Sequence, residues 1–161
     1  MISHPDSFSL LAELAMALAG FSGVAAAFSG RDRSYQSTEF IRLVSLFLTS
    51  GVVFAGSGAV YVLLLADIAP ALVFRFVSLA VMLAYGGVAI PWTIKAYRAA
   101  GEANSTSENW ALHLTLLHTF LIVALTGSNV ILGQPYILLG AFWLLLAFGL
   151  WMFSRLLTRA N

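Results

Sequence analysis

Five stretches of apolar residues, separated by short polar segments, dominate the pattern along this chain. They run approximately over residues 8–29, 40–66, 71–94, 110–132 and 136–157. Each is close to the ~20 residues that an α-helix needs to cross about 30 Å of hydrocarbon, because a helix rises about 1.5 Å per residue. The pattern therefore predicts an all-α bundle of five transmembrane helices.

Two short segments mark boundaries between neighbouring apolar stretches. Asp67-Ile68-Ala69-Pro70 separates the second from the third, because proline suits the first turn of a new helix and disfavours helical geometry in the residue before it. Gly133-Gln134-Pro135 separates the fourth from the fifth as a tight turn. The longest loop is expected from about Ala99 to Asn109. No loop is long enough for a soluble domain, so we expect a single transmembrane domain over residues 1–161.

The positive charges predict how the helices are oriented. With five spans and the N-terminus outside, Arg75 is the one basic residue near the outer side. The basic residues near the inner side are Arg31, Arg33, Arg42, Lys95, Arg98, Arg155 and Arg159. Cytoplasmic loops carry an excess of Lys and Arg, so this distribution predicts an N-out, C-in topology. The alternative is a four-span protein whose first segment is re-entrant or lies on the membrane surface, which breaks the charge pattern.

Composition narrows the class of protein further. The chain is 60% hydrophobic and 9% charged, whereas soluble domains have roughly 25% charged residues, so most of it is expected to lie in lipid. A net charge of +1 without clustered Lys and Arg predicts no nucleic-acid partner. The absence of cysteine excludes disulfides and thiolate-bound metal clusters on this chain. No catalytic or phosphate-binding motif is present, and we expect no enzyme activity, cofactor or metal.

A carboxylate, Glu13, lies inside the first apolar stretch. An unpaired charge in the bilayer interior costs about 2.5–3.5 kcal/mol or more. Arg75 lies at a similar depth in the third stretch, so an ion pair between the two would account for both. Two alternatives remain: Arg75 reaches the outer headgroups while Glu13 is protonated or faces water, or the pair belongs to an ion or proton site.

A polar stripe follows the inner end of the second stretch. Arg42, Ser45 and Thr49 share one helix face at spacings i, i+3 and i+7, which is suited to lining a water-filled vestibule. In the alternative, Arg42 reaches anionic lipid, and the hydroxyls of Ser45 and Thr49 bond to carbonyls of their own helix.

The fourth stretch ends in the polar segment Thr126-Gly127-Ser128-Asn129. Asn129 is expected near the outer side, where it could hydrogen-bond to other helices or join a polar cluster with Glu13 and Arg75. Earlier in this stretch, His113 and His118 point in directions roughly 140° apart, so they cannot ligate one ion from a single face. We expect His113 at the membrane interface and His118 bonded to a neighbouring helix.

Small residues recur at helical spacing in the first two stretches. In lipid such residues let helix backbones approach closely, and they predict helix packing within the chain or between copies. The predicted packing residues are Ala12, Ala15, Ala19, Gly20, Gly23, Gly51, Ala55 and Ala59. Two such faces exceed what five helices need, which favours a homo-oligomer.

The third stretch carries Gly86 and Gly87 ahead of Pro91. The proline ring clashes with the carbonyl four residues back, so a kink or hinge is expected near Gly87. Alternatively, the helix stops at Ile90 and Pro91 begins an interfacial turn.

The segment Ala12-Glu13-Leu14-Ala15-Met16-Ala17-Leu18-Ala19-Gly20-Phe21-Ser22-Gly23-Val24, followed by an Arg-bearing loop and Phe40-Ile41-Arg42-Leu43, resembles a group of small bacterial multi-pass proteins of unassigned function. The resemblance covers about the first third of the chain and implies a bacterial inner-membrane protein, without supplying an activity. Together with the buried charges it favours a homo-oligomeric protein with a channel- or transporter-like role. The alternative is a structural or accessory subunit that packs against itself or a larger membrane complex.

Overall fold

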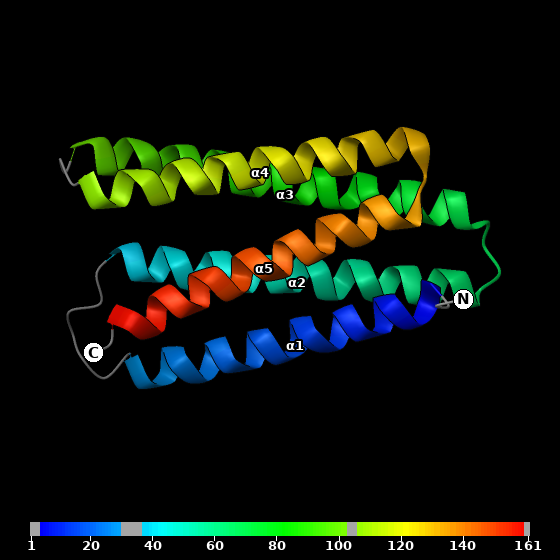
Figure 1. Cartoon of the computed structure of the whole chain (residues 1–161), viewed down its shortest axis with the longest axis horizontal. Coiled ribbons are helices and arrows are strands. Elements are labelled where there is room, and N and C mark those ends of the chain that lie inside the picture. The colour runs from blue at the N-terminus through cyan, green and yellow to red at the C-terminus, as the bar shows by residue number, and fades with distance from the viewer. Residues whose placement is uncertain (1–3, 30–36, 103–105, 160–161) are drawn as a thin grey trace. The chain divides into compact units, whose positions relative to one another are not determined.

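The structure, a computed structural model, describes the backbone of residues 4–29, 37–102 and 106–159, and the side chains of residues 6–24, 45–92, 94–95 and 113–154 (Figure 1). Within these ranges the chain forms helices and short turns, without strands. The helices are α1 (His4–Ser29), α2 (Ser37–Leu65), α3 (Pro70–Glu102), α4 (Thr106–Leu132) and α5 (Pro135–Arg159). All five are long and apolar enough to cross a membrane. The predicted all-α fold with five transmembrane helices is confirmed, while the N-out, C-in orientation stays a prediction.

The third helix is longer than expected. α3 has 33 residues, continues through Pro91 and ends at Glu102, and α4 begins at Thr106. The interpretation in which the helix stops at Ile90 is therefore wrong, and so is the long loop from Ala99 to Asn109. A proline removes a single hydrogen bond of the helix backbone, and membrane helices tolerate this loss because neighbouring groups satisfy the freed carbonyl.

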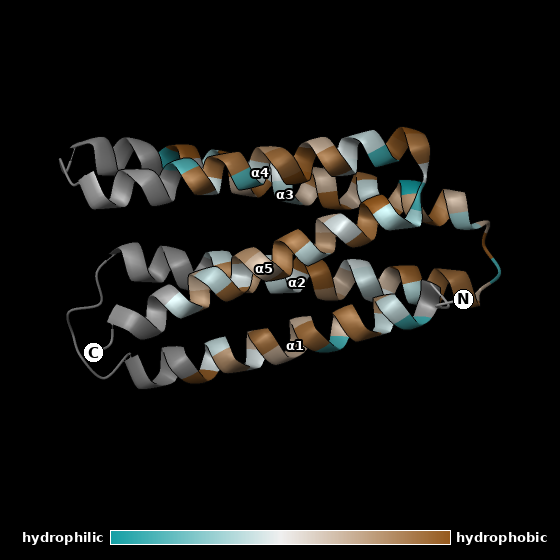
Figure 2. Ribbon diagram, viewed as in Figure 1, coloured by the Kyte–Doolittle hydropathy of each residue, from teal (hydrophilic) through white to brown (hydrophobic). Residues whose placement is uncertain are grey.

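Large apolar side chains are exposed on all five helices, and apolar residues recur along each ribbon (Figure 2). Phe21 is 64% exposed, Phe76 is 61% exposed and Phe120 is 71% exposed. Water-soluble monomers rarely present apolar surface on this scale. Lipid is the solvent that accommodates it, so the chain is a membrane-spanning protein.

The chain divides into two compact units. The first unit comprises the chain up to Ala69 together with the chain from Phe142 onward, and the second comprises Pro70–Ala141. The first unit thus holds α1, α2 and most of α5, and the second holds α3, α4 and the start of α5. α1 packs along α2 in the first unit, and α3 packs along α4 in the second.

Buried side chains in the first unit recur at alternating spacings of three and four residues. In α1 they are Phe8, Leu11, Ala15, Leu18 and Ser22; in α2 they include Leu46, Ser50, Val53, Ser57 and Val60. This spacing is typical of helices that pack knobs into holes at a shallow crossing angle. α5 completes the unit and runs parallel to α1, because Phe142 contacts Phe8 edge-to-face with ring centroids 6.2 Å apart, and Gly149 lies against Leu18.

The second unit has a comparable core between α3 and α4. The α3 side chains buried there include Phe74, Ser78, Val81 and Tyr85, and those of α4 are Thr119, Ile122, Thr126 and Asn129. A short turn at Gly133 and Gln134 connects α4 to α5. In this turn the backbone N–H groups of Gly133 and Gln134 both donate to Asn129.

Candidate functional site

Glu13 lies on the exposed side of α1. Helical geometry puts it roughly 160° around the axis from Ala15, which lies in the buried row of the first unit. Along the axis, Glu13 is roughly 10 Å from Asp6, where the apolar span begins. The hydroxyl of Ser9 donates a hydrogen bond to Glu13 Oε1 across a long distance of 3.5 Å. The carboxylate therefore faces away from the helices of its own unit.

Among the described side chains of the first unit, none that could carry a positive charge stands near Glu13. The side chains described in that unit, residues 6–24, 45–69 and 142–154, include no Lys, Arg or His. Leu18, Leu46 and Gly149 lie together in the core of the unit. Along the helices, Arg42 and Arg155 lie beyond this contact, on the side away from Glu13. Glu13 thus has no cationic partner among the described side chains of its own unit.

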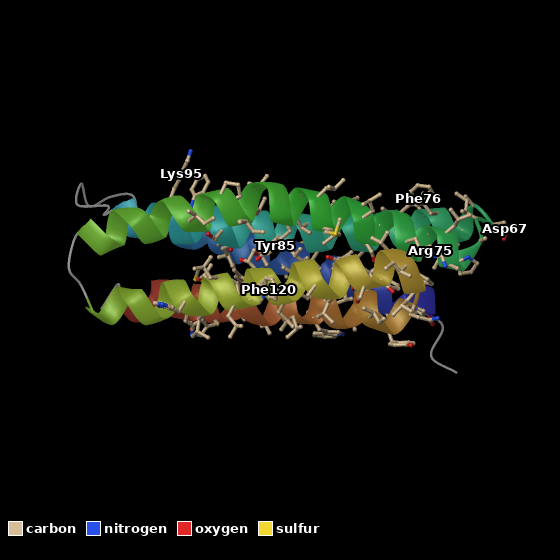
Figure 3. The ribbon with its side chains drawn as sticks, turned by 90° about the horizontal axis from the view of Figure 1, so that it is seen from above. Asp67, Arg75, Phe76, Tyr85, Lys95 and Phe120 are labelled. Carbon is tan, nitrogen blue, oxygen red and sulfur yellow. The ribbon has the colours of Figure 1, made fainter. Side chains whose placement is uncertain are left out.

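Arg75 occupies the second turn of α3, roughly 8 Å along the axis from Pro70. It is exposed, and its side chain lies across the turn between α4 and α5. A Cβ added at Gly133 would lie 3.1 Å from its Nε and 3.3 Å from its Cγ. Figure 3 shows Arg75 and Lys95 toward opposite ends of α3, with Tyr85 between them. The guanidinium therefore sits at the C-terminal end of α4, where the helix dipole favours positive charge.

Arg75 also lacks an opposite charge within its own unit. The side chains described there, residues 70–92, 94–95 and 113–141, include no Asp or Glu. The acidic residues of that unit, Glu102 and Glu108, lie roughly 35–40 Å away along the helix axes. Because Glu13 and Arg75 belong to different units, the ion pair between them stays a prediction.

Asn129 connects three parts of the second unit. Its side chain is completely buried, and its Nδ2 donates to Ser78 Oγ on α3 at 2.8 Å. Its Oδ1 accepts the backbone N–H of Gln134 at 2.7 Å, and its backbone carbonyl accepts the N–H of Gly133 at 2.8 Å. The residue thus caps the end of α4, fixes the turn into α5 and joins α4 to α3.

Gly133 is required by the geometry of the same turn. Its φ of 66° lies in the left-handed region, which glycine adopts without a steric penalty. A Cβ there would also come within 2.9 Å of the carbonyl oxygen of Ala71. The sequence marked this segment as a turn, but the close approach of α3 depends on how the helices pack.

The structure describes two of the three residues in the polar stripe on α2, Ser45 and Thr49. Thr49 is buried, and its Oγ1 donates to the carbonyl oxygen of Ser45 at 2.7 Å. This is the back-bonding arrangement that the sequence offered as the alternative to a vestibule. The side chain of Arg42 lies outside those described, so its role stays a prediction.

Two buried hydroxyls were missed by the sequence analysis. Ser50 Oγ and Ser57 Oγ on α2 are buried and have no hydrogen-bond partner among the described residues. They are seven residues apart, which places them on the same face of the helix. Serine is common in membrane helices because it is small, so the sequence contained no signal that distinguished these two.

The predicted packing residues occupy different surroundings. Ala15 is fully buried in the core of the first unit. Gly20, Gly51 and Ala55 are exposed, whereas Ala12, Ala19, Gly23 and Ala59 are half-buried. A Cβ added at Gly20 or Gly51 would meet no atom within 4 Å. Packing of these exposed positions against another copy stays a prediction.

The hinge candidates lie within the continuous helix α3. Gly86 is half-buried, and a Cβ there would lie 3.4 Å from Val123 of α4, whereas a Cβ at Gly87 would meet no atom within 4 Å. Pro91 lies inside the helix. Hinge motion at these residues stays a prediction.

His118 bonds a neighbouring helix, as expected. Its Nδ1 lies 3.4 Å from the hydroxyl of Tyr85 on α3, and the two rings meet edge-to-face with centroids 6.1 Å apart. The sequence did not identify Tyr85 as the partner, because residue pairing between helices depends on their register. Among the described residues, no group of three His, Asp or Glu side chains could hold a metal ion.

Comparison with known proteins identifies no relative of this chain. No protein family, no curated protein and no solved structure matches the chain significantly. The residues and their geometry therefore carry the functional argument.

Proposed function

We propose that the chain is a homo-oligomeric membrane protein with a channel- or transporter-like role, in which Glu13 faces a polar path. The observation that carries this proposal is the carboxylate of Glu13, which is exposed on a membrane-spanning helix and has no cation among the described side chains of its own unit. Intramembrane carboxylates are costly and usually mark the path of an ion or a proton. The resemblance of the first span further supports a location in a bacterial inner membrane.

Flux through reconstituted vesicles tests this role. Purified protein is placed in liposomes that carry a pH-sensitive dye or a potassium-sensitive dye, and a gradient is applied. We expect flux above that of empty vesicles, and we expect Glu13→Gln to reduce it at least tenfold because the carboxylate that faces the path is lost.

Asp6→Asn is the matched control, because Asp6 is an exposed acid in the first turn of the same helix. It removes the same charge outside the apolar span and should leave flux unchanged. Vesicles that show no flux above background for protons, sodium, potassium or chloride would contradict the channel-like role.

The second candidate is a structural or accessory subunit. It is supported by the hydroxyl of Thr49, which bonds back to its own helix and is unavailable to a polar path. This role predicts that Glu13→Gln alters the native mass of the oligomer without any flux being present in the wild type. Native mass spectrometry in lipid nanodiscs measures that mass.

A further inference from the structure

In each unit of the chain, one charged side chain lies in an apolar span and has no opposite charge among the side chains that the structure describes there. In the first unit this is Glu13, and the described side chains around it include no base. In the second unit it is Arg75, and the described side chains around it include no acid. Glu13 and Arg75 are therefore two side chains of opposite charge, each without a described partner in its own unit.

The helices that carry the two charges, α1 and α3, begin at the same membrane face. α2 ends at Leu65 and α3 begins at Pro70, so a chain that crosses the bilayer with every helix has the starts of α1 and α3 on one side. Glu13 lies roughly 10 Å into α1 from Asp6, and Arg75 lies roughly 8 Å into α3 from Pro70. Their depths match to within one helical turn.

We infer that Glu13 of one copy pairs with Arg75 of a second copy of this chain. This inference rests on the proposed homo-oligomer and names its contact. Both side chains are exposed in the single chain, as groups that meet a second copy must be. Beside Glu13, Ala17 and Gly20 are exposed as well, and residues this small let a neighbouring helix approach closely.

A two-fold arrangement makes this contact reciprocal. In a symmetric dimer, residue i of one copy meets residue j of the other, and j meets i. Glu13 and Arg75 then form two ion pairs per dimer, and all four charges are compensated. Arginine suits the pairing because its planar guanidinium binds a carboxylate through two parallel hydrogen bonds.

Crosslinking tests the contact directly, because the natural chain contains no cysteine. A tagged Glu13→Cys chain is mixed in membranes with a differently tagged Arg75→Cys chain and treated with a short bis-maleimide. We expect a crosslinked species that carries both tags. The pair Val62→Cys and Arg75→Cys is the control, since Val62 is 61% exposed near the same end of the first unit, and it should give little product.

A double variant separates pairing between copies from pairing within one chain. If Glu13→Cys/Arg75→Cys crosslinks inside the monomer while the mixed single variants give no product, the inference is overturned. It is also overturned if neither sample reacts above the Val62 control, as happens when Arg75 binds a lipid phosphate instead.

Charge reversal provides an independent readout. Glu13→Arg and Arg75→Glu should each weaken self-association at least tenfold, and the double reversal should restore it, because the pair is rebuilt with exchanged signs. If the oligomer forms and these substitutions do not change the strength of self-association, the inference is overturned while the proposed homo-oligomer is retained. A native mass equal to one chain under all conditions overturns both.

Discussion

Replacing Asn129 with alanine should destabilise the second unit by a predictable amount. The substitution removes the bond from Nδ2 to Ser78 and the bond from Oδ1 to the N–H of Gln134. A hydrogen bond between membrane helices contributes about 0.6 kcal/mol on average and at most about 1.7, and the bond to the turn adds about 0.5–1.5 kcal/mol. We therefore expect the free energy of unfolding to fall by about 1–3 kcal/mol.

Unfolding of the purified protein by SDS in mixed micelles measures this change. Loss of helix is followed by circular dichroism, and the loss of packing by fluorescence of the four tryptophans. Ser128→Ala is the matched control, because Ser128 is exposed and its hydroxyl bonds to the carbonyl of Leu125 in its own helix. That variant should change stability by less than about 0.5 kcal/mol.

A double-mutant cycle isolates the bond between the helices. Ser78→Ala removes the acceptor of Asn129 Nδ2, and the double variant should lose less than the sum of the two single variants, with a coupling of about 0.6–1.7 kcal/mol. If the coupling is zero, or if Asn129→Ala is no worse than Ser128→Ala, the assignment of Asn129 as the link between α3 and α4 is refuted.

Two glycine substitutions, each with a second glycine as its control, test close packing in the same unfolding assay. Gly133→Ala places a Cβ at positive φ and 2.9 Å from a backbone carbonyl oxygen of α3. It should lower the free energy of unfolding by at least about 1–2 kcal/mol. Gly20→Ala is its control, because a Cβ there meets no atom within 4 Å, and it should be neutral or stabilising. Gly56→Ala places a Cβ 2.6 Å from the ring of Phe142 and should cost about 1–3 kcal/mol by overpacking, whereas Gly58→Ala meets nothing within 4 Å. Equal stability of Gly56→Ala and Gly58→Ala would contradict the packing of α5 on α2.

The number and approximate limits of the helices could be read from the sequence, because crossing lipid requires long apolar runs. The turns at Pro70 and Gly133 could be read as well, because proline and glycine restrict where a helix begins or ends. The extension of α3 past Pro91 could not, since local chemistry allows either a stop or a continuation there, and neighbouring groups decide between them.

The partners of the polar residues were harder to predict. The sequence marked Asn129 as able to bond another helix, but the choice of Ser78 depends on the register between α3 and α4. Likewise, apolar residues face both lipid and the core of a membrane protein, so periodicity did not identify the exposed face of α1. This is why Glu13 was recognised as a costly charge while the direction in which it points was not.

The contact between Phe8 and Phe142 has a consequence for synthesis. These residues lie near opposite ends of the chain, whereas the second unit is one continuous segment, Pro70–Ala141. During synthesis the second unit can therefore finish while the first unit still awaits its last helix. Until α5 enters the membrane, the surfaces of Phe8 and Gly56 that Phe142 later covers stay open.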